Sequence, residues 1–145
     1  SVALPGTIKE IRDSAFVGCT YFDPIVLPKS LKRIGSFAFK GCKKVAEVAI
    51  PDSVQYIGAS AFADCTNLAE VSLGSGVQTL SAYCFARCAL SKFTVRALTP
   101  PALDQTVFED AILEDAILYV PKGYKRVYKS SVWGQYFDEI EELKK

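Results

Sequence analysis

The sequence predicts an α/β repeat solenoid, in which short parallel strands stack along one axis and a small helical cap closes the C-terminal end. Two observations lead to this prediction. Apolar residues recur with a fixed spacing of 23 residues over residues 4–95, and the remaining segment carries aromatic residues at helical spacing. A unit of this length cannot bury its apolar edge alone, so successive units stack and like residues fall on like residues.

Six columns of apolar residues define the repeat, and each column keeps its 23-residue spacing over four units. The columns are Leu4, Leu27, Ile50 and Leu73, then Ile8, Leu31, Val54 and Val77, then Ile11, Ile34, Ile57 and Leu80, then Ala15, Ala38, Ala61 and Cys84, then Phe16, Phe39, Phe62 and Phe85, and finally Cys19, Cys42, Cys65 and Cys88. We therefore expect four coils over residues 1–95 and a capping segment of the same domain over residues 96–145.

Each coil contains a short strand that is followed by a turn residue. Val71 and Leu73 flank the polar Ser72, which is the period-two alternation of a half-buried strand. The residue after the strand is proline in three coils and Gly74 in the fourth. Proline has no N–H to donate, so it suits the end of a strand. We expect these strands to pair in parallel into one narrow sheet.

The remainder of each coil returns toward its starting side. The leg at residues 53–58 alternates again and predicts a second short extended segment. The Ala-Phe pair that follows, such as Ala61-Phe62, is expected to begin a turn or a single turn of helix. The phenylalanine is large enough to fill the wide side of the coil.

The last 50 residues have the composition of a cap, which a solenoid needs because its end exposes an apolar cross-section. Residues 117–120 are predicted as the last strand, and Ser130-Ser131 as the break between two short helices. Two sets of residues have helical spacing: Tyr124, Val127 and Tyr128, and then Trp133, Phe137 and Ile140. We expect Trp133 to pack within the cap and the charged stretch 138–145 to fray.

The N-terminal end shows no comparable cap. We expect an open end there, faced by Leu4, Ile8, Ile11 and Phe16. Either upstream coils precede this chain or another chain covers these residues. The absence of Met favours truncation. Open ends also favour weak, concentration-dependent end-to-end self-association.

The composition disfavours several functional classes. The chain has 145 residues, with 17 Lys and Arg against 16 Asp and Glu. This balance argues against a nucleic-acid partner, which requires a concentrated basic footprint. Since no apolar run approaches the ~20 residues of a membrane-spanning helix, we expect no membrane insertion. The chain has no His, so it lacks the commonest general base and a common metal ligand.

The residues of the repeat carry a family resemblance. The stretch from Ile57 to Leu68, Ile-Gly-Ala-Ser-Ala-Phe-Ala-Asp-Cys-Thr-Asn-Leu, with the apolar strand that follows it, resembles the BspA-type leucine-rich repeat, and residues 34–42 match equally well. The closing stretch, with Thr99-Pro100-Pro101, residues 118–123 and Trp133, is similar to the end of such proteins from gut and oral Bacteroidetes.

This resemblance implies a leucine-rich-repeat right-handed superhelix in a secreted or cell-surface bacterial protein, with any signal or anchor outside this chain. Some members of the family take part in adhesion to host proteins or to other microbes. The first coil departs from the pattern at Asp13 and at Tyr21-Phe22-Asp23-Pro24, and the fourth has Leu80-Ser81 and Cys84. Such departures are typical of terminal coils.

The cysteine column allows two interpretations. Stacked coils lie ~4.8 Å apart, a separation that a disulfide tolerates. In-register side chains point in parallel, however, whereas a disulfide needs Cβ atoms ~3.8 Å apart and a near-right-angle torsion. We therefore favour a ladder of small buried side chains. A metal site at Cys84 and Cys88 is disfavoured because no His or second Cys pair completes a ligand set, and no cofactor is expected.

Repeat scaffolds bind their partners on the exposed side of the sheet. The outward columns are Pro24, Glu47, Glu70 and Lys92, and Val26, Ala49, Ser72 and Thr94. On the opposite leg, Tyr56 is the exposed aromatic residue. The candidate partner-binding residues are therefore Glu47, Ala49, Glu70, Ser72, Lys92, Thr94 and Tyr56.

Two functions from different classes fit these observations. The first is an extracellular or cell-surface module, without catalytic activity, that binds a protein or glycan of a host or microbial surface. The sheet positions hold no aromatic anchor of the kind that dominates tight interfaces, so this binding is expected to be weak and multivalent. The second is a structural spacer that holds other domains away from the cell surface.

Overall fold

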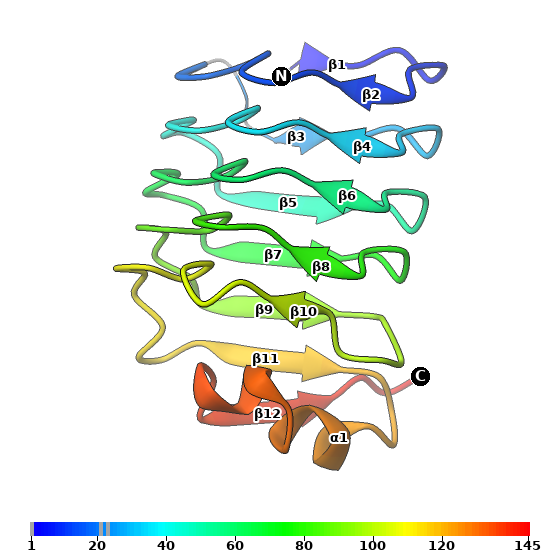
Figure 1. Ribbon diagram of the computed structural model, residues 1–145, viewed down its shortest axis with the longest axis vertical. Helices are drawn as coiled ribbons and strands as arrows, with labels where there is room; N and C mark the ends of the chain where they lie inside the picture. Colours follow the sequence, from blue (N-terminus) through cyan, green and yellow to red (C-terminus); the bar gives the residue numbers. More distant parts are fainter. Residues whose placement is uncertain (1, 21, 23) are drawn as a thin grey trace.

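The chain forms a stack of coils in which each coil gives one strand to each of two faces (Figure 1). The computed structural model describes residues 2–20, 22 and 24–145; Tyr21 and Asp23, two of the positions where the first coil departs from the repeat, lie outside them. Strands β1 (Val2–Ala3) and β12 (Glu139–Glu142) lie at opposite ends of the stack (Figure 1).

One face carries the strands that precede the proline turns, and the other carries the strands of the return leg. The first set comprises β1 (Val2–Ala3), β3 (Ile25–Val26), β5 (Glu47–Ile50), β7 (Glu70–Leu73), β9 (Lys92–Val95), β11 (Ile117–Val120) and β12 (Glu139–Glu142). The return set comprises β2 (Glu10–Ile11), β4 (Arg33–Ile34), β6 (Tyr56–Ile57), β8 (Thr79–Leu80) and β10 (Ala102–Leu103).

All the strand pairs are parallel, as the sequence predicts. Strands β5, β7, β9, β11 and β12 form one five-stranded sheet, and β2, β4, β6, β8 and β10 form the other. The second extended segment of each coil is thereby confirmed. The first face is divided, because β3 pairs with β1 in a separate two-stranded sheet. Val48 lies opposite Val71 and Ile34 opposite Ile57, so residues 23 apart are register partners.

The core is a stack of like residues. The rings of Phe39 and Phe62 are 5.3 Å apart at 11°, and those of Phe62 and Phe85 are 5.5 Å apart at 6°. All three side chains are fully buried. Offset stacking of this kind adds to the free energy gained by burying the rings. The phenylalanine column is thus the central support of the solenoid, as its spacing indicates.

The segment between the return strand and the next coil is a series of turns, not a turn of helix. In the third coil the Ala61 N–H donates to the Gly58 carbonyl (3.3 Å). The Phe62 N–H donates to the backbone carbonyl of Cys84 in the next coil (2.9 Å). Two columns in these turns have a left-handed backbone. They are Ser14, Phe37, Ser60 and Tyr83, and Gly18, Gly41, Asp64, Arg87 and Asp110. Each non-glycine member carries a conformational cost of about 1 kcal/mol, which the bonds between coils offset.

The sequence-based count of four coils is too low. Phe108 follows Phe85 by a further 23 residues, and its ring stacks on Phe85 at 6.3 Å and 20°. Strands β9 and β10 belong to this fifth coil, and β11 starts the next turn of the stack. The spacing between β9 and β11 rises to 25 residues, so the next turn of the stack departs from the fixed period.

Two short helices close the C-terminal end. Helix α1 spans Lys125–Lys129 and a 3-10 helix, η1, spans Val132–Gln135, and Ser130-Ser131 separates them as predicted. Trp133 is fully buried, and its indole N–H donates to the Pro101 carbonyl (2.9 Å). In the described part of the chain, no helix is long and apolar enough to cross a membrane.

The expectation that residues 138–145 fray is wrong. Residues 139–142 form β12, which pairs in parallel with β11 along its whole length. Ile140 is buried at the register position of Leu118, so one apolar side chain anchors the strand. The Glu142 carboxylate accepts the Lys125 N–H (3.1 Å), which connects the strand to α1. The helical spacing of Phe137 and Ile140 therefore arises from a strand that follows a short 3-10 helix.

Candidate partner-binding surfaces

The strands β5, β7 and β9 present alternate residues to solvent because strand side chains have a period of two. In β5, Val48 and Ile50 are buried while Glu47 and Ala49 are exposed. The outward residues of β3, β5, β7 and β9, together with Arg96, line a shallow groove of about 480 Å³, here called the sheet groove. The predicted residues Glu47, Ala49, Glu70, Ser72, Lys92 and Thr94 all lie along it.

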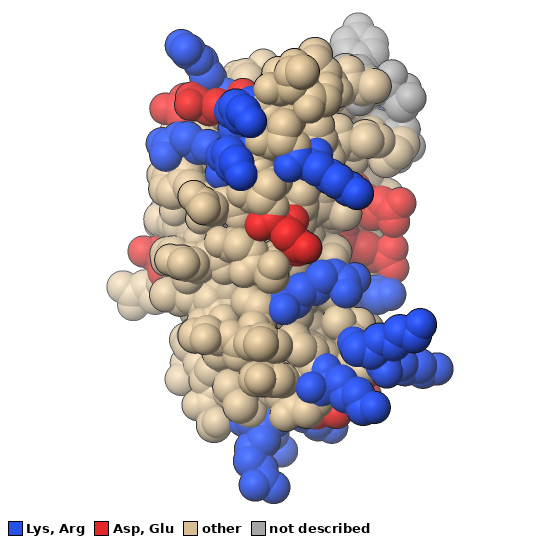
Figure 2. All heavy atoms as spheres, turned by 90° about the vertical axis from the view of Figure 1, so that its right-hand side faces the viewer, with Lys and Arg blue, Asp and Glu red and all other residues tan. Residues whose placement is uncertain are grey.

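The register of the strands sets the charge pattern of the sheet groove. Glu47 lies directly opposite Glu70, and Glu70 opposite Lys92. In Figure 2, which views the stack from the side of the proline turns, acidic side chains lie above basic ones along the right-hand edge. The sheet groove therefore changes from acidic to basic along the stack, with Arg96 at the basic end.

The acidic half of the sheet groove is unfavourable for folding. Like charges directly opposite on neighbouring strands repel each other. Within residues 2–20, 22 and 24–145, no cationic side chain forms an ion pair with Glu47 or Glu70. Lys92 instead places its ammonium 5.1 Å from the centre of the Tyr119 ring. The two carboxylates are thus free to meet a partner, next to the exposed apolar side chain of Val26.

Two predicted site residues differ from expectation. Thr94 points to the outer face but is 4% exposed, because its register partners are Ser72 and the much larger Tyr119 of β11. Tyr56 lies on the return sheet, away from the groove, and the Arg33 guanidinium covers its ring at 4.0 Å. The structure therefore groups six of the seven candidate residues and separates Tyr56 from them.

Arg96 is the groove residue that the sequence analysis missed. It occupies the position after the strand, where the earlier coils have proline or Gly74, and its N–H donates to the Leu73 carbonyl (3.2 Å). The replacement of a turn residue by arginine was the available signal. Unlike proline or glycine, arginine does not favour a turn conformation, so its charged side chain is available for another role.

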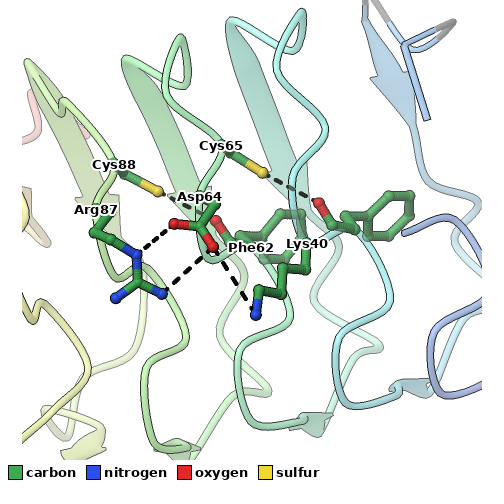
Figure 3. A network of polar contacts seen from close by, with 7 residues as sticks. Lys40, Phe62, Asp64, Cys65, Arg87 and Cys88 are labelled. Carbon is green, nitrogen blue, oxygen red and sulfur yellow. Dashed lines mark hydrogen bonds and ion pairs between the residues drawn. The ribbon is translucent and has the colours of Figure 1, made fainter. Parts of the chain in front are cut away.

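A second polar cluster lies on the outer turns (Figure 3). The Asp64 carboxylate accepts hydrogen bonds from the Arg87 guanidinium, and the Lys40 ammonium lies 3.9 Å from it. The hydrogen bond from Arg87 lowers the pKa of the Asp64 carboxyl, while burial partly opposes this effect. Because these residues belong to three successive coils, the cluster joins neighbouring turns by charge.

The cysteine column forms a ladder behind these turns (Figure 3). The thiols of Cys65 and Cys88 donate to the carbonyls of Phe39 and Phe62, each at 3.2 Å. Cys42, Cys65, Cys84 and Cys88 are buried, which confirms their predicted packing role, while Cys19 in the first coil is half-buried. Burial raises the pKa of Cys42 to about 11 and that of Cys88 to about 12.

These thiols are poor nucleophiles, since the thiolate is the reactive form and burial disfavours it. In the part of the chain that the structure describes, no group of three or more Cys, Asp or Glu side chains is placed to hold a metal ion. The arrangement can bind partners through charge and shape.

A comparison with protein-family models decides the family. The model of the BspA type leucine-rich repeat region matches residues 1–114 with six copies. The chain belongs to the BspA-type leucine-rich-repeat family. Proteins built from these repeats are typically non-catalytic scaffolds, and this BspA-type chain is a protein-interaction repeat module. The six copies also agree with a stack that continues beyond residue 95.

Solved structures of bacterial proteins share the fold. A leucine-rich repeat protein of T. pallidum is 35% identical over 64% of this BspA-type chain, with a TM-score of 0.57. The pneumococcal vaccine antigen PcpA is 18% identical over 97% of the chain (TM-score 0.62), and a leucine-rich cell surface protein of Faecalibacterium prausnitzii is 15% identical over 98% (TM-score 0.51). The latter two likenesses show the fold alone.

The BspA-type chain spans less than two thirds of each of these proteins. The matched part covers 48% of the T. pallidum protein, 40% of PcpA and 59% of the F. prausnitzii protein. A comparison with curated protein sequences gives no match.

Proposed function

We propose that this chain is an extracellular or cell-surface adhesion module that binds a protein or glycan of a host or microbial surface through the sheet groove, and that it has no catalytic activity. The observation that carries the proposal is the pair of unpaired carboxylates of Glu47 and Glu70 on adjacent strands. A pair that costs folding free energy and gains no partner within the described chain is best explained by a ligand.

The chemistry of the sheet groove indicates what it binds. Glu47 and Glu70 favour a cationic group at one half, and Lys92 with Arg96 favours an anionic group at the other. The exposed side chain of Val26 adds an apolar contact beside the acidic half. A shallow groove with charges of both signs gives electrostatic specificity and fast association more than tight binding. Repetition of the groove along a longer solenoid raises the overall avidity.

The names of the similar proteins support a surface location. PcpA is described as a vaccine antigen, and the F. prausnitzii protein as a cell surface protein. The absence of catalysis is supported by the buried cysteines, whose pKa values are raised, and by the lack of His in the chain. The surface location and the absence of catalysis both belong to the proposal.

A binding screen tests the proposal. The purified chain is applied to immobilised extracellular-matrix proteins, mucin glycans and bacterial surface polymers, beside the double variant Glu47→Arg/Glu70→Arg. A matched control, Glu109→Arg/Glu114→Arg, makes the same change of charge at two exposed glutamates outside the groove. Losing a pair of groove contacts should weaken binding about tenfold or more.

The outcomes separate the candidate functions. Binding that the groove variant loses and the control keeps supports an adhesion module and places its face. Equal binding by all three proteins contradicts the role of the sheet groove. Failure of every surface to bind favours a structural spacer. One structural observation also supports the spacer: the hydrogen-bonded stack of coils separates β1 from β12 (Figure 1).

A further inference from the structure

A second groove lies on the outer turns. These turns are at the left of Figure 1. It has a volume of about 520 Å³ and is called the turn groove here. Its lining comes from the turns of the first three coils and shares no residue with the sheet groove. Val17 and Phe37 supply its apolar surface, while Lys40, Lys43 and Asp64 supply its charges.

Phe37 is the unusual residue of this groove. Its backbone has a left-handed φ of 60°, which is strained for a bulky side chain. The equivalent positions are Ser14 in the first coil, Ser60 in the third and Tyr83 in the fourth, so the turn forms with or without an aromatic residue. The Phe37 ring also stays 40% exposed and therefore gains little from burial. Neither backbone preference nor core packing accounts for phenylalanine at a position that lines this groove.

The apolar contact extends to the neighbouring coil. Val17 is 49% exposed and lines the same groove as Phe37. The turn that carries Phe37 is held firmly, because its N–H donates to the Ala59 carbonyl (2.9 Å). The groove thus offers a preformed apolar seat, and a preformed seat reduces the entropy that a ligand loses on binding.

The charges around this seat are unbalanced. Lys43 is exposed and has no ion-pair partner among the described residues, and Lys40 lies 5.4 Å from the centre of the Phe37 ring. The lining carboxylate, Asp64, is shared between Arg87 and Lys40, whose ammonium lies 3.9 Å from it. Two lysines therefore face the groove against one neutralised aspartate, which favours an anionic ligand.

We propose that the turn groove binds an acidic linear segment of a partner protein, which seats an apolar side chain on Val17 and Phe37 and places carboxylates beside Lys40 and Lys43. An aromatic or aliphatic anchor flanked by charges is a common form of peptide recognition. The groove volume falls within the ~300–1,000 Å³ usual for small binding sites. A membrane surface would instead require a broad amphipathic face. This site is additional to the sheet groove.

Peptide selection tests the proposal directly. A random linear-peptide phage library is selected on the full chain, with counter-selection on Phe37→Ser, and the enriched peptides are synthesised and measured by fluorescence anisotropy. Serine is the natural residue at this position in two other coils, so the variant is expected to fold. Tyr83→Ser is the matched control, because Tyr83 is exposed in the same left-handed column but does not line the turn groove.

The proposal predicts that enriched peptides combine acidic residues with an apolar one. Phe37→Ser should weaken their binding about tenfold, as should Lys43→Glu, whereas Tyr83→Ser should leave it unchanged. Raising the salt concentration should also weaken binding, since the lysine contacts are exposed. Wild-type affinity in Glu47→Arg/Glu70→Arg keeps this result separate from the function proposed for the sheet groove.

Three outcomes would overturn the proposal. The first is enrichment of neutral or basic peptides, and the second is no enrichment beyond that on Phe37→Ser. The third is sedimentation of the chain with anionic phospholipid vesicles, dependent on Phe37, in the absence of peptide binding, which would assign the groove to a lipid surface. Circular dichroism melting of Phe37→Ser and Tyr83→Ser confirms that all comparisons use folded protein.

Discussion

Phe16 in the first coil and Phe108 in the fifth occupy the same column, but the column ends differently beyond them. The ring of Phe16 contacts Phe39 and Phe22 and is half-buried. Phe108 stacks on Phe85 on one side, and on the other it meets Trp133, Tyr136 and Phe137 with rings turned out of parallel. One end therefore extends a pattern of parallel rings, while the other breaks the pattern to cover it.

This difference shows how the position of a repeated residue sets its contribution. In a linear stack, each unit is stabilised by its own packing and by its nearest neighbours. Residues of the middle coils have neighbours on both sides, whereas the equivalent residues of the first coil have one. Identical residues in the repeat should thus contribute unequally to stability, and the predictions below measure that inequality.

The largest difference is expected in thiol labelling. At pH 8, iodoacetamide should modify half-buried Cys19 much faster than Cys65, which is accessible only after opening of the stack. If opening is rare, with about one molecule in a thousand or fewer unfolded, the rates should differ by about a thousandfold or more. Mass spectrometry of peptides reads the rates at each position.

Raised pKa values add to this protection. Burial raises the pKa of Cys42 to about 11 and that of Cys88 to about 12, so little thiolate is present at pH 8. In denatured protein, all five thiols should react with iodoacetamide. Counting fewer than four would contradict the ladder of free cysteines.

Removing the cover of the C-terminal end should destabilise the fold strongly. Trp133→Ala deletes a fully buried ring and leaves the Pro101 carbonyl without its donor. We expect a loss of about 3–5 kcal/mol in the free energy of unfolding. Trp133→Phe keeps most of the packing and should cost about 1–3 kcal/mol through the unpaired carbonyl. Urea denaturation followed by circular dichroism measures both, and equal losses would show that the hydrogen bond, not the ring, dominates.

The difference in unfolding free energy between alanine variants at two positions of the phenylalanine column should be smaller than the loss for Trp133→Ala. Phe62 is stacked between two rings and fully buried, so Phe62→Ala should cost about 3–5 kcal/mol. Phe16→Ala removes a half-buried ring and should cost about 2 kcal/mol less. Urea denaturation tests this prediction. The midpoints of the two variants are compared, provided that their unfolding free energies depend on urea concentration with the same slope. A loss for Phe16 as large as that for Phe62 would mean that the first coil is as tightly packed as the third.

The charge cluster of the outer turns should contribute least. Arg87 lowers the pKa of the Asp64 carboxyl below its unfolded value near 3.9. The resulting stability is present above that value and is lost as the pH falls through the lower, folded pKa. Asp64→Asn should therefore cost at most about 1 kcal/mol at pH 7, because the pair is near the surface. The difference from wild type should shrink below pH 4, and a constant difference would assign the loss to something other than charge.

The repeated part of the fold was predictable because its residues report it directly. Phe39, Phe62 and Phe85 stack in the structure at the spacing that the sequence shows, and Val71 and Leu73 alternate with Ser72 as a strand requires. In these coils the local pattern and the tertiary contacts agree at every position. Sequence reasoning works well where one rule is repeated and each copy confirms the others.

The closing segment was harder because its pattern has more than one structural solution. Trp133, Phe137 and Ile140 fit a helical spacing, but they belong to a 3-10 helix, a connection and β12. Residues 139–142 form a strand and not a helix because they pair with the free edge of β11. That edge is a tertiary feature, which the local sequence does not contain. Phe108 keeps the 23-residue spacing from Phe85, but the cysteine column continues as Ala111, so the fifth coil repeats the pattern only in part.

The candidate sites divide in the same way. The period of two placed Glu47, Glu70 and Lys92 on one face, and the structure agrees. Thr94 is buried by a neighbour from the irregular part of the chain, which the repeat does not predict. The turn groove depends on a left-handed backbone at Phe37, and no glycine or asparagine marks that position in the sequence.

The parallel ladder also determines how the module responds to force. Its two termini lie at opposite ends of the stack, so tension between them pulls coils apart along the axis (Figure 1). The hydrogen bonds between coils are then loaded a few at a time, and the chain peels instead of shearing. Each coil that opens releases about 80 Å of extended chain from its 23 residues. A tethered molecule of this design lengthens under load and spares the contacts at its end.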